Sequence, residues 1–197
     1  MDGWTGPALT LLIGYGLGSI PFGLILTRAF GAGDIRKIGS GNIGATNVLR
    51  TGRKGLAAAT LLFDALKGVA AVLIAWMIAP ELAIYGGVGA FLGHLYPVWL
   101  GFKGGKGLAT LLGVAFALDW RLGAAYALVW LGSFATFRIS SVSGMATALA
   151  LPVAAFALHL PYWPILAAVA LLVVWAHRTN VRRLFAGTEP KVGQKTA

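Results

Sequence analysis

Apolar residues dominate the chain in seven long runs, and short polar or glycine-rich stretches separate these runs. A helix needs about 20 apolar residues to cross the hydrocarbon core of a bilayer, so such runs predict membrane-spanning helices. The fourth run is short: about 13 residues reach only about 20 Å, which fits either a tilted span or a re-entrant hairpin with the fifth run. The runs lie near residues 7–30, 55–79, 83–100, 107–119, 121–139, 144–159 and 162–178.

The composition also indicates a membrane protein. The 197 residues are 58% hydrophobic and only 11% charged, with a mean hydropathy of +0.80, whereas a soluble domain carries about 25% charged residues. The chain has no cysteine, which excludes disulfides and thiolate chemistry. We therefore expect an all-α membrane protein with seven transmembrane helices in a single domain, residues 1–197, with short amphipathic or loop elements on its cytoplasmic face.

Charge predicts the orientation of the chain. Of the 16 Lys and Arg residues, all but Lys67 and Arg121 fall in alternate connections, and basic residues collect on the cytoplasmic side of a membrane. We therefore expect the N-terminus outside and the C-terminus inside; the short outside segments carry Asp2, Glu81 and Asp119 instead. Because the membrane accounts for the net charge of +10, nucleic acid is not an expected partner. The inside segments are 28–55, 101–106, 138–143 and 178–197.

The first inside loop has the composition of an anion-binding site. Three glycines within six residues let a backbone approach a ligand and turn its N–H groups toward an anion. Short polar side chains and an arginine add donors suited to phosphate. An ordinary glycine-rich turn with Asn and Ser caps fits about as well. The residues concerned are Gly39, Ser40, Gly41, Asn42, Gly44, Thr46, Asn47 and Arg50.

A second inside loop reads Gly104-Gly105-Lys106-Gly107 and precedes an apolar run. A lysine at a helix N-terminus can join the exposed N–H groups and the helix dipole in holding an anion. The spacing is not that of a P-loop, because Gly107 follows the lysine where a hydroxyl is required. The alternative is a basic cytoplasmic turn, an explanation that suits Lys103 better than Lys106.

The last predicted span ends in a cluster of polar residues. On a helix His177 and Asn180 share one face, and Arg178 and Arg182 share another. The arginines also suit a helix C-terminus for electrostatic reasons alone. Further hydroxyls lie on the same predicted face of the membrane, in the stretch 140–143.

Other chemistry finds little support. The three histidines are scattered and the inside carboxylates are few, so no metal-ligand set or Ser-His-Asp triad is apparent. Asp64 and Lys67 stand three residues apart within the second span, where charged residues usually pair or face a polar site. A structural ion pair is the simpler explanation for them.

Together these clusters resemble the PlsY family, the membrane-embedded bacterial glycerol-3-phosphate acyltransferases that use acyl phosphate. The resemblance runs through most of the chain. The matching stretches are Gly18-Ser19-Ile20-Pro21-Phe22-Gly23, Gly39 to Asn47 with Arg50, Asp64 with Lys67-Gly68, Gly93-His94 with Pro97, Phe102 to Gly107, His177-Arg178 with Asn180, and Gly187 with Glu189 and Lys191.

The resemblance implies transfer of a fatty acyl group from acyl phosphate to glycerol 3-phosphate, giving lysophosphatidic acid and inorganic phosphate in phospholipid biosynthesis. Loop 39–47 would bind the acyl phosphate, with Ser40 also in a catalytic role. Glycerol 3-phosphate would be held by Arg50, Lys106, His177, Asn180 and either Ser141 or Ser143, of which Lys106, His177 and Asn180 are also expected to act in catalysis.

The resemblance also implies a multi-pass protein of the bacterial inner membrane, with its active site facing the cytoplasm. It implies no metal and no cofactor. We expect a monomer, and contact with the enzyme that makes acyl phosphate is compatible with this. The alternatives are an anion or organic-phosphate transporter or channel, and a structural membrane protein whose basic loops hold anionic lipid.

Overall fold

A computed structural model describes residues 3–193 of the chain, and every described helix lies in one of two compact units. Unit 1 is Met1–Leu118 and unit 2 is Asp119–Ala197. Residues 3–193 contain helices and turns but no strand, so the all-α prediction is confirmed. Asp2 and Lys195, which entered the charge argument, lie outside the described residues, as does the end of the chain.

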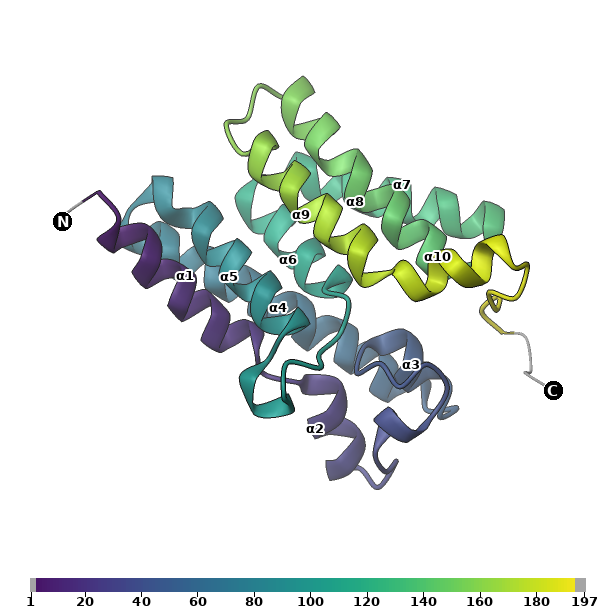
Figure 1. Ribbon diagram of the computed structural model, residues 1–197. Helices are drawn as coiled ribbons and strands as arrows, with labels where there is room; N and C mark the ends of the chain where they lie inside the picture. Colours follow the sequence, from purple (N-terminus) through teal and green to yellow (C-terminus); the bar gives the residue numbers. More distant parts are fainter. Residues whose placement is uncertain (1–2, 194–197) are drawn as a thin grey trace. The chain divides into compact units, whose positions relative to one another are not determined.

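Unit 1 is a group of packed helices with two loops at one end (Figure 1). The long helix α4 packs against α1, α5 and α6, and α1 packs along α5. The α-helices are α1 (Thr5–Gly18), α2 (Phe22–Ala29), α3 (Ala45–Leu49), α4 (Lys54–Ile78), α5 (Ala83–Leu95) and α6 (Leu108–Leu118); single 3-10 turns are η1 (Ile35–Lys37), η2 (Pro80–Leu82) and η3 (Val98–Leu100).

Helices α1 and α5 approach one another backbone to backbone. A Cβ atom added at Gly14 would collide with the carbonyl oxygen of Gly86, and one added at Gly93 would collide with that of Tyr15. Small residues permit this contact, which is typical of helix packing in membranes, where van der Waals contact replaces the hydrophobic effect between helices.

This packing gives a matched pair of substitutions on one helix. Gly14→Ala should destabilise the protein by about 1–3 kcal/mol through overpacking. Gly16→Ala meets nothing within 4 Å and should be neutral or stabilising, since alanine favours a helix over glycine by about 1 kcal/mol. Thermal unfolding in detergent measures both variants. Equal melting temperatures for the two would contradict the close α1–α5 contact.

The first predicted span is broken. Helix α1 ends at Gly18 and α2 begins at Phe22, because Pro21 lacks an N–H and disfavours helical backbone at Ile20. The break leaves the Ile20 carbonyl oxygen outside the regular helical pattern, where Lys67 of α4 donates to it over 2.9 Å.

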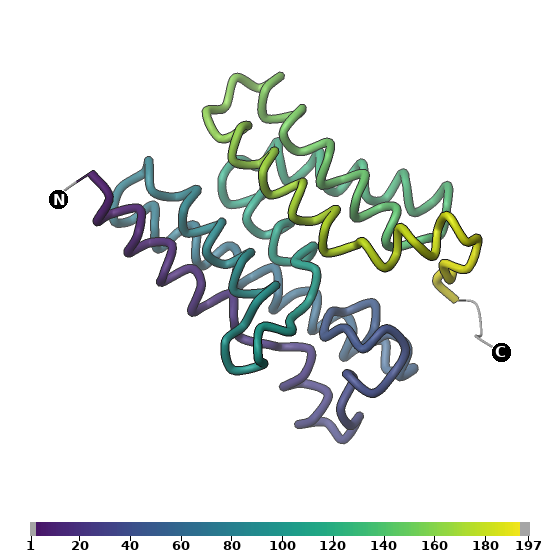
Figure 2. The backbone as a smooth tube through the Cα atoms, in the orientation of Figure 1, coloured from purple at the N-terminus to yellow at the C-terminus, as the bar shows by residue number. Residues whose placement is uncertain are grey.

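Unit 2 consists of four consecutive helices, with α8 packed against both α7 and α9 (Figure 2). The last two helices meet at His177 with a bend of 59°. The helices are α7 (Trp120–Phe137), α8 (Ser140–Ala157), α9 (Trp163–Ala176) and α10 (Arg178–Phe185).

All seven apolar runs contain helix, but their boundaries differ from the prediction in three places. Helix α5 stops at Leu95, ahead of Pro97, and not at residue 100. Helix α8 begins at Ser140 and not at residue 144, so the candidate serines lie in its first turn. The last predicted run, 162–178, extends two residues past α9, which stops at Ala176 before the bend at His177 and the start of α10 at Arg178.

Length and composition identify fewer spans than seven among residues 3–193. Three segments are long and apolar enough to cross a membrane, and the bent α9–α10 pair makes a fourth if it counts as one span. Helix α6, with 11 residues, is a shorter apolar helix, in line with the short fourth run. The count of seven crossings and the orientation stay predictions. The three segments are Thr5–Ala29, Lys54–Ile78 and Ser140–Ala157.

Candidate active site

The first glycine-rich loop of unit 1 is folded around one buried amide, that of Asn47. Its Nδ2 lies 2.8 Å from the carbonyl oxygens of Ile35 and Asn42 and 3.1 Å from that of Ile38. Its Oδ1 accepts from the Ser40 backbone N–H at 3.2 Å. The side chain is 2% exposed, so Asn47 organises the loop from within.

The surface of this loop carries donors that suit a phosphate. Ser40, Thr46 and Arg50 are exposed, and one Arg50 N–H reaches Asn47 Oδ1 over 3.2 Å. Gly39 has a φ of 52°, and a Cβ there would meet the side chains of Arg50 and Asn47, so the position requires glycine. Asn42 accepts from the Gly44 N–H at 2.9 Å, a side-chain turn that precedes α3.

The second loop is attached to the end of α5. The Gly104 N–H donates to the Leu95 carbonyl and the Gly105 N–H to the His94 carbonyl, each over 3.0 Å. These two N–H groups are therefore bonded to α5, and anion binding by the N–H groups at the start of α6 stays a prediction. Lys106 is half-buried and precedes the first turn of α6 by two residues, as predicted from the sequence.

In unit 2, His177 occupies the bend between α9 and α10 and is 1% exposed. Its Nδ1 lies 2.8 Å from the Val173 carbonyl oxygen. A carbonyl only accepts, so Nδ1 carries the proton and Nε2 is the acceptor edge of the neutral ring. That tautomer is the one in which Nε2 can take a proton.

Glu189 joins two of the predicted residues. Its Oε1 accepts from Ser141 Oγ and from Asn180 Nδ2, each at 2.6 Å, and its Oε2 accepts from Arg183 Nε at 2.6 Å. Ser143, by contrast, is fully buried and donates to the Ile139 carbonyl of its own helix. Of the two candidate serines, Ser141 is the one beside Asn180.

Glu189 was not predicted as a site residue, although it belongs to one of the stretches that carry the family resemblance, Gly187 with Glu189 and Lys191. Its contact with Ser141 spans 48 residues, and no local spacing signals such a pair. Its acidity beside a run of arginines was the available signal.

The carboxylates of Asp34 and Glu189, which lie in segments predicted to be cytoplasmic, both accept hydrogen bonds from neighbouring side chains. Burial raises the pKa of Glu189, but hydrogen bonds from Ser141, Asn180 and Arg183 outweigh burial and hold the pKa below its ordinary value. The pKa of Asp34 is likewise low, chiefly because Arg36 hydrogen-bonds to it, with a further ion pair to Arg28. Neither carboxylate is therefore suited to accept a proton near neutral pH.

The low pKa of Glu189 predicts acid sensitivity. A carboxylate with a depressed pKa stabilises the fold above its ordinary value, here 4.5, and loses that contribution as pH falls through the folded-state pKa. The melting temperature in detergent should therefore fall below about pH 4.5. Glu189→Gln should show a flatter acid limb. Asp34→Asn measures separately how much the exposed Asp34–Arg36 ion pair contributes to the acid sensitivity. An unchanged acid limb in Glu189→Gln would contradict the assignment.

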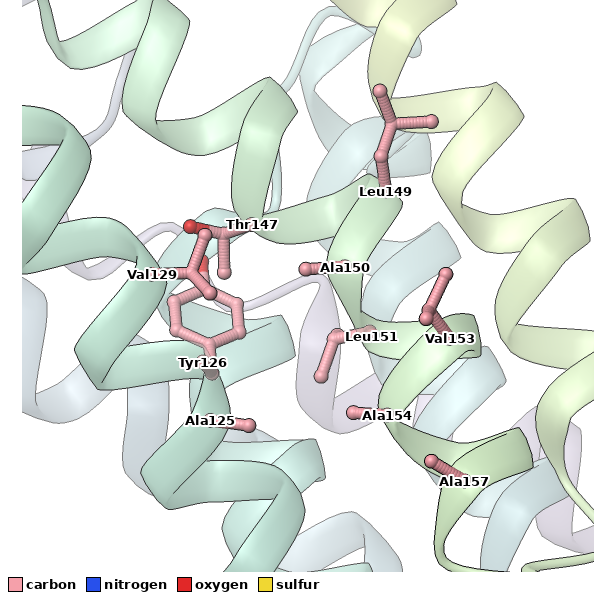
Figure 3. A pocket seen from close by; sticks show the side chains of 10 residues that line it. All are labelled: Ala125, Tyr126, Val129, Thr147, Leu149, Ala150, Leu151, Val153, Ala154 and Ala157. Atoms are coloured by element: carbon pink, nitrogen blue, oxygen red, sulfur yellow. The ribbon is translucent and has the colours of Figure 1, made fainter.

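Apolar grooves follow the helices of unit 2. One of about 500 Å³ runs between α7 and α8, with Tyr126 on one side and Leu151 and Ala154 on the other (Figure 3). A second of about 400 Å³ lies at the α9–α10 bend, where the Arg178 guanidinium is 5.2 Å from the Trp175 ring centre. The first groove is lined almost entirely by apolar side chains, whereas Arg178 and Arg182 add two cations to the lining of the second.

Known proteins share this sequence and this fold. The profile of the family described as glycerol-3-phosphate acyltransferase matches residues 8–187. A glycerol-3-phosphate acyltransferase of Mesorhizobium japonicum is 60% identical, covering 96% of this chain and 98% of the relative. One of Erythrobacter litoralis is 54% identical, covering 99% of this chain and 100% of the relative.

The solved structures agree. The crystal structure of PlsY (YgiH), an integral membrane glycerol 3-phosphate acyltransferase, in its glycerol 3-phosphate form, has a TM-score of 0.89 at 35% identity and covers 95% of this chain and 96% of that one. Its lysophosphatidic acid form has a TM-score of 0.85 at 33% identity, covering 94% of each chain. The helical fold, the apolar spans and the similarity to these proteins together define the class of the protein, an integral membrane acyltransferase. The chain belongs to the glycerol-3-phosphate acyltransferase family, that of PlsY.

Proposed function

We propose that this chain transfers a fatty acyl group from acyl phosphate to glycerol 3-phosphate, releasing lysophosphatidic acid and inorganic phosphate. The observation that carries the proposal is the loop around Asn47, whose buried amide bonds to three backbone carbonyls, to the Ser40 N–H and to the Arg50 guanidinium. The relatives' names support glycerol 3-phosphate as acceptor. The acyl phosphate donor rests on the motifs of the sequence.

The chemistry needs no covalent intermediate. A hydroxyl oxygen of glycerol 3-phosphate attacks the carbonyl carbon of acyl phosphate, the new ester bond forms, and the bond to the phosphate oxygen breaks. Because the acyl group is already activated, catalysis rests on positioning and on stabilising negative charge on the carbonyl oxygen and the departing phosphate. The hydroxyl proton goes either to His177 Nε2 or to an oxygen of a substrate phosphate.

The residues divide between the two substrates in this proposal. Donors for the acyl phosphate come from loop 39–47, with Asn47 holding the loop in shape. Glycerol 3-phosphate is assigned to Arg50, Lys106, His177, Asn180 and Ser141, the serine chosen over Ser143 because it shares Glu189 with Asn180. The acyl chain lies along apolar helix surfaces in the lipid.

The membrane setting is also part of the proposal. We place seven crossings, a single domain over 1–197, an outside N-terminus and a cytoplasmic C-terminus in a bacterial inner membrane, with the active site on the cytoplasmic face. The chain acts as a monomer, and contact with the enzyme that makes acyl phosphate is compatible with that site. Family membership favours this function over the transporter and lipid-holding alternatives.

The test uses purified protein in detergent or lipid with palmitoyl phosphate and glycerol 3-phosphate. Inorganic phosphate and lysophosphatidic acid are measured together, with palmitoyl-CoA as the control donor. We expect equal amounts of both products with palmitoyl phosphate and none with palmitoyl-CoA. Turnover with palmitoyl-CoA, or the absence of turnover with either donor in folded protein, would overturn the proposal.

A further inference from the structure

Three ionisable side chains are buried together inside unit 1. Asp64 and Lys67 come from α4 and His94 from α5, and all are at most 5% exposed. The ion pair predicted from the sequence is confirmed: Lys67 Nζ lies 2.7 Å from Asp64 Oδ1. The histidine, 27 residues further along the chain, was not expected to join it.

The Lys67 ammonium contacts three partner atoms, two through hydrogen bonds and one, the Asp64 oxygen, through an ion pair without hydrogen-bond geometry. They are Asp64 Oδ1 at 2.7 Å, His94 Nδ1 at 2.9 Å and the Ile20 carbonyl oxygen at 2.9 Å. The last is accessible only because the first span breaks at Pro21. This complete set of partners fixes the ammonium at the junction of α4, α5 and the α1–α2 break.

This arrangement also fixes the tautomer of His94. The nearby Nδ1 lies 2.9 Å from Lys67 Nζ but 3.6 Å from Asp64 Oδ1, beyond hydrogen-bond distance. An ammonium cannot accept a hydrogen bond, so Nδ1 must be the acceptor. A neutral imidazole with an accepting Nδ1 carries its proton on Nε2. Protonation at Nδ1 as well would place an N–H against the ammonium at 2.9 Å, which is repulsive.

The Nε2 edge of His94 faces the Gly-Gly-Lys-Gly loop. A Cβ atom added at Gly105 would collide first with His94 Nε2, which shows how closely the ring approaches the loop. The same histidine accepts the Gly105 N–H with its backbone carbonyl at 3.0 Å. Ring and backbone of His94 thus both contact the residue that precedes Lys106.

We propose that His94, held as its Nε2–H tautomer by Lys67 and Asp64, is a positioning residue that places the Gly104–Gly107 loop and with it the Lys106 ammonium. It acts through Lys106 and does not itself touch substrate. The inference rests on the proposed function where it assigns Lys106 to a substrate phosphate. Its tautomer and the contact with Gly105 are independent of that function.

The first measurement is nuclear magnetic resonance of protein labelled with ¹⁵N in its histidine rings. Only three histidines are present, so His94→Gln, His159→Gln and His177→Gln assign every signal. We expect a His94 ring with one acceptor-type and one N–H-type nitrogen, the proton on Nε2. Lys67→Met should move the proton toward Nδ1, which then faces the Asp64 carboxylate 3.6 Å away. If that variant does not fold, Asp64→Asn/Lys67→Met removes both charges and serves instead. An Nδ1–H or doubly protonated His94 in the unaltered protein would overturn the proposal.

The second measurement is kinetic. His94→Asn keeps a polar group near Nδ1 but leaves the Nε2 position empty, and should raise KM for glycerol 3-phosphate on the order of tenfold with a smaller change in kcat. His94→Gln restores an N–H near the Nε2 position and should recover most of that loss. His159→Gln is the control and should leave both constants unchanged.

A double-mutant cycle separates positioning from general stability. If His94 acts through Lys106, the losses in His94→Asn and Lys106→Met should not add in the double variant. Additive losses, or a defect in His94→Asn that falls on kcat alone, would overturn the proposal. Should the protein show no acyl transfer at all, the proposed function fails, while the ¹⁵N spectra still decide whether Lys67 fixes the tautomer of His94.

Discussion

Asn47→Asp should lower kcat/KM by about 100-fold, because the buried amide donates to three backbone carbonyls that a carboxylate cannot serve. Leaving a buried acceptor unpaired costs about 1–3 kcal/mol, so the loss of both amide N–H donors amounts to about 2–6 kcal/mol. Each 1.36 kcal/mol corresponds to about tenfold in rate if the whole cost falls on the active loop. The carboxylate also brings a negative charge into a site meant for phosphate.

The measurement is steady-state kinetics with both substrates varied, beside circular dichroism and thermal unfolding to establish that the helices persist. Leu49→Ala, an exposed position on the same short helix α3, is the control and should stay within about twofold. If Asn47→Asp kept more than half of its activity, the loop around Asn47 would not depend on this amide, and our main argument for phosphate binding there would fail.

Glu189→Gln should have the second largest effect, a loss of about 10- to 100-fold in kcat/KM. One amide oxygen can still accept from Ser141 and Asn180, but the new NH₂ group then faces the Arg183 N–H, donor against donor. Hydrogen bonds to a charged partner contribute about 1.5–3 kcal/mol, which sets this range. If the new side chain turns to relieve this clash, Ser141 and Asn180 lose the oxygen that both of them donate to.

Arg183→Met provides a graded comparison, since it removes one donor and leaves the contacts of Glu189 with Ser141 and Asn180 in place. It should lose less activity than Glu189→Gln. Thr188→Ala, beside the carboxylate in the sequence but exposed, should change little. Equal losses in Arg183→Met and Glu189→Gln would show that the ion pair, and not the anchoring of Ser141 and Asn180, is what matters.

Hydrophobic patterning predicted the helices well, since a run of apolar residues in a bilayer must satisfy its own backbone. The predicted helix boundaries are wrong where a helix begins with polar residues or where it bends. Ser140 and Ser141 read as loop but form the first turn of α8. Residue 177 is neither proline nor glycine, so the sequence has no helix-breaking residue there that would predict the bend.

The candidate site was predicted by residue type more successfully than by role. Asn47 looked like a ligand, yet its amide turns inward, and sequence does not show which way a side chain faces. The N–H groups of Gly104 and Gly105 bond to carbonyls at the end of α5, a contact that the glycine-rich sequence does not indicate. Partners separated by 27 or 48 residues, as in Lys67–His94 and Ser141–Glu189, become visible only in three dimensions.

The attachment of the Gly104–Gly107 loop to α5 has a consequence for how this sequence can vary. The last carbonyls of α5 hold the loop that carries Lys106, and the same helix rests on α1 through Gly86 and Gly93. A larger residue in that seam would push α5 outward and carry the lysine with it. Larger residues at the α1–α5 contact should therefore be tolerated poorly even where they are apolar enough for the bilayer. Conversely, a variant whose Lys106 is displaced should be rescued by second-site substitutions in α1 or α5.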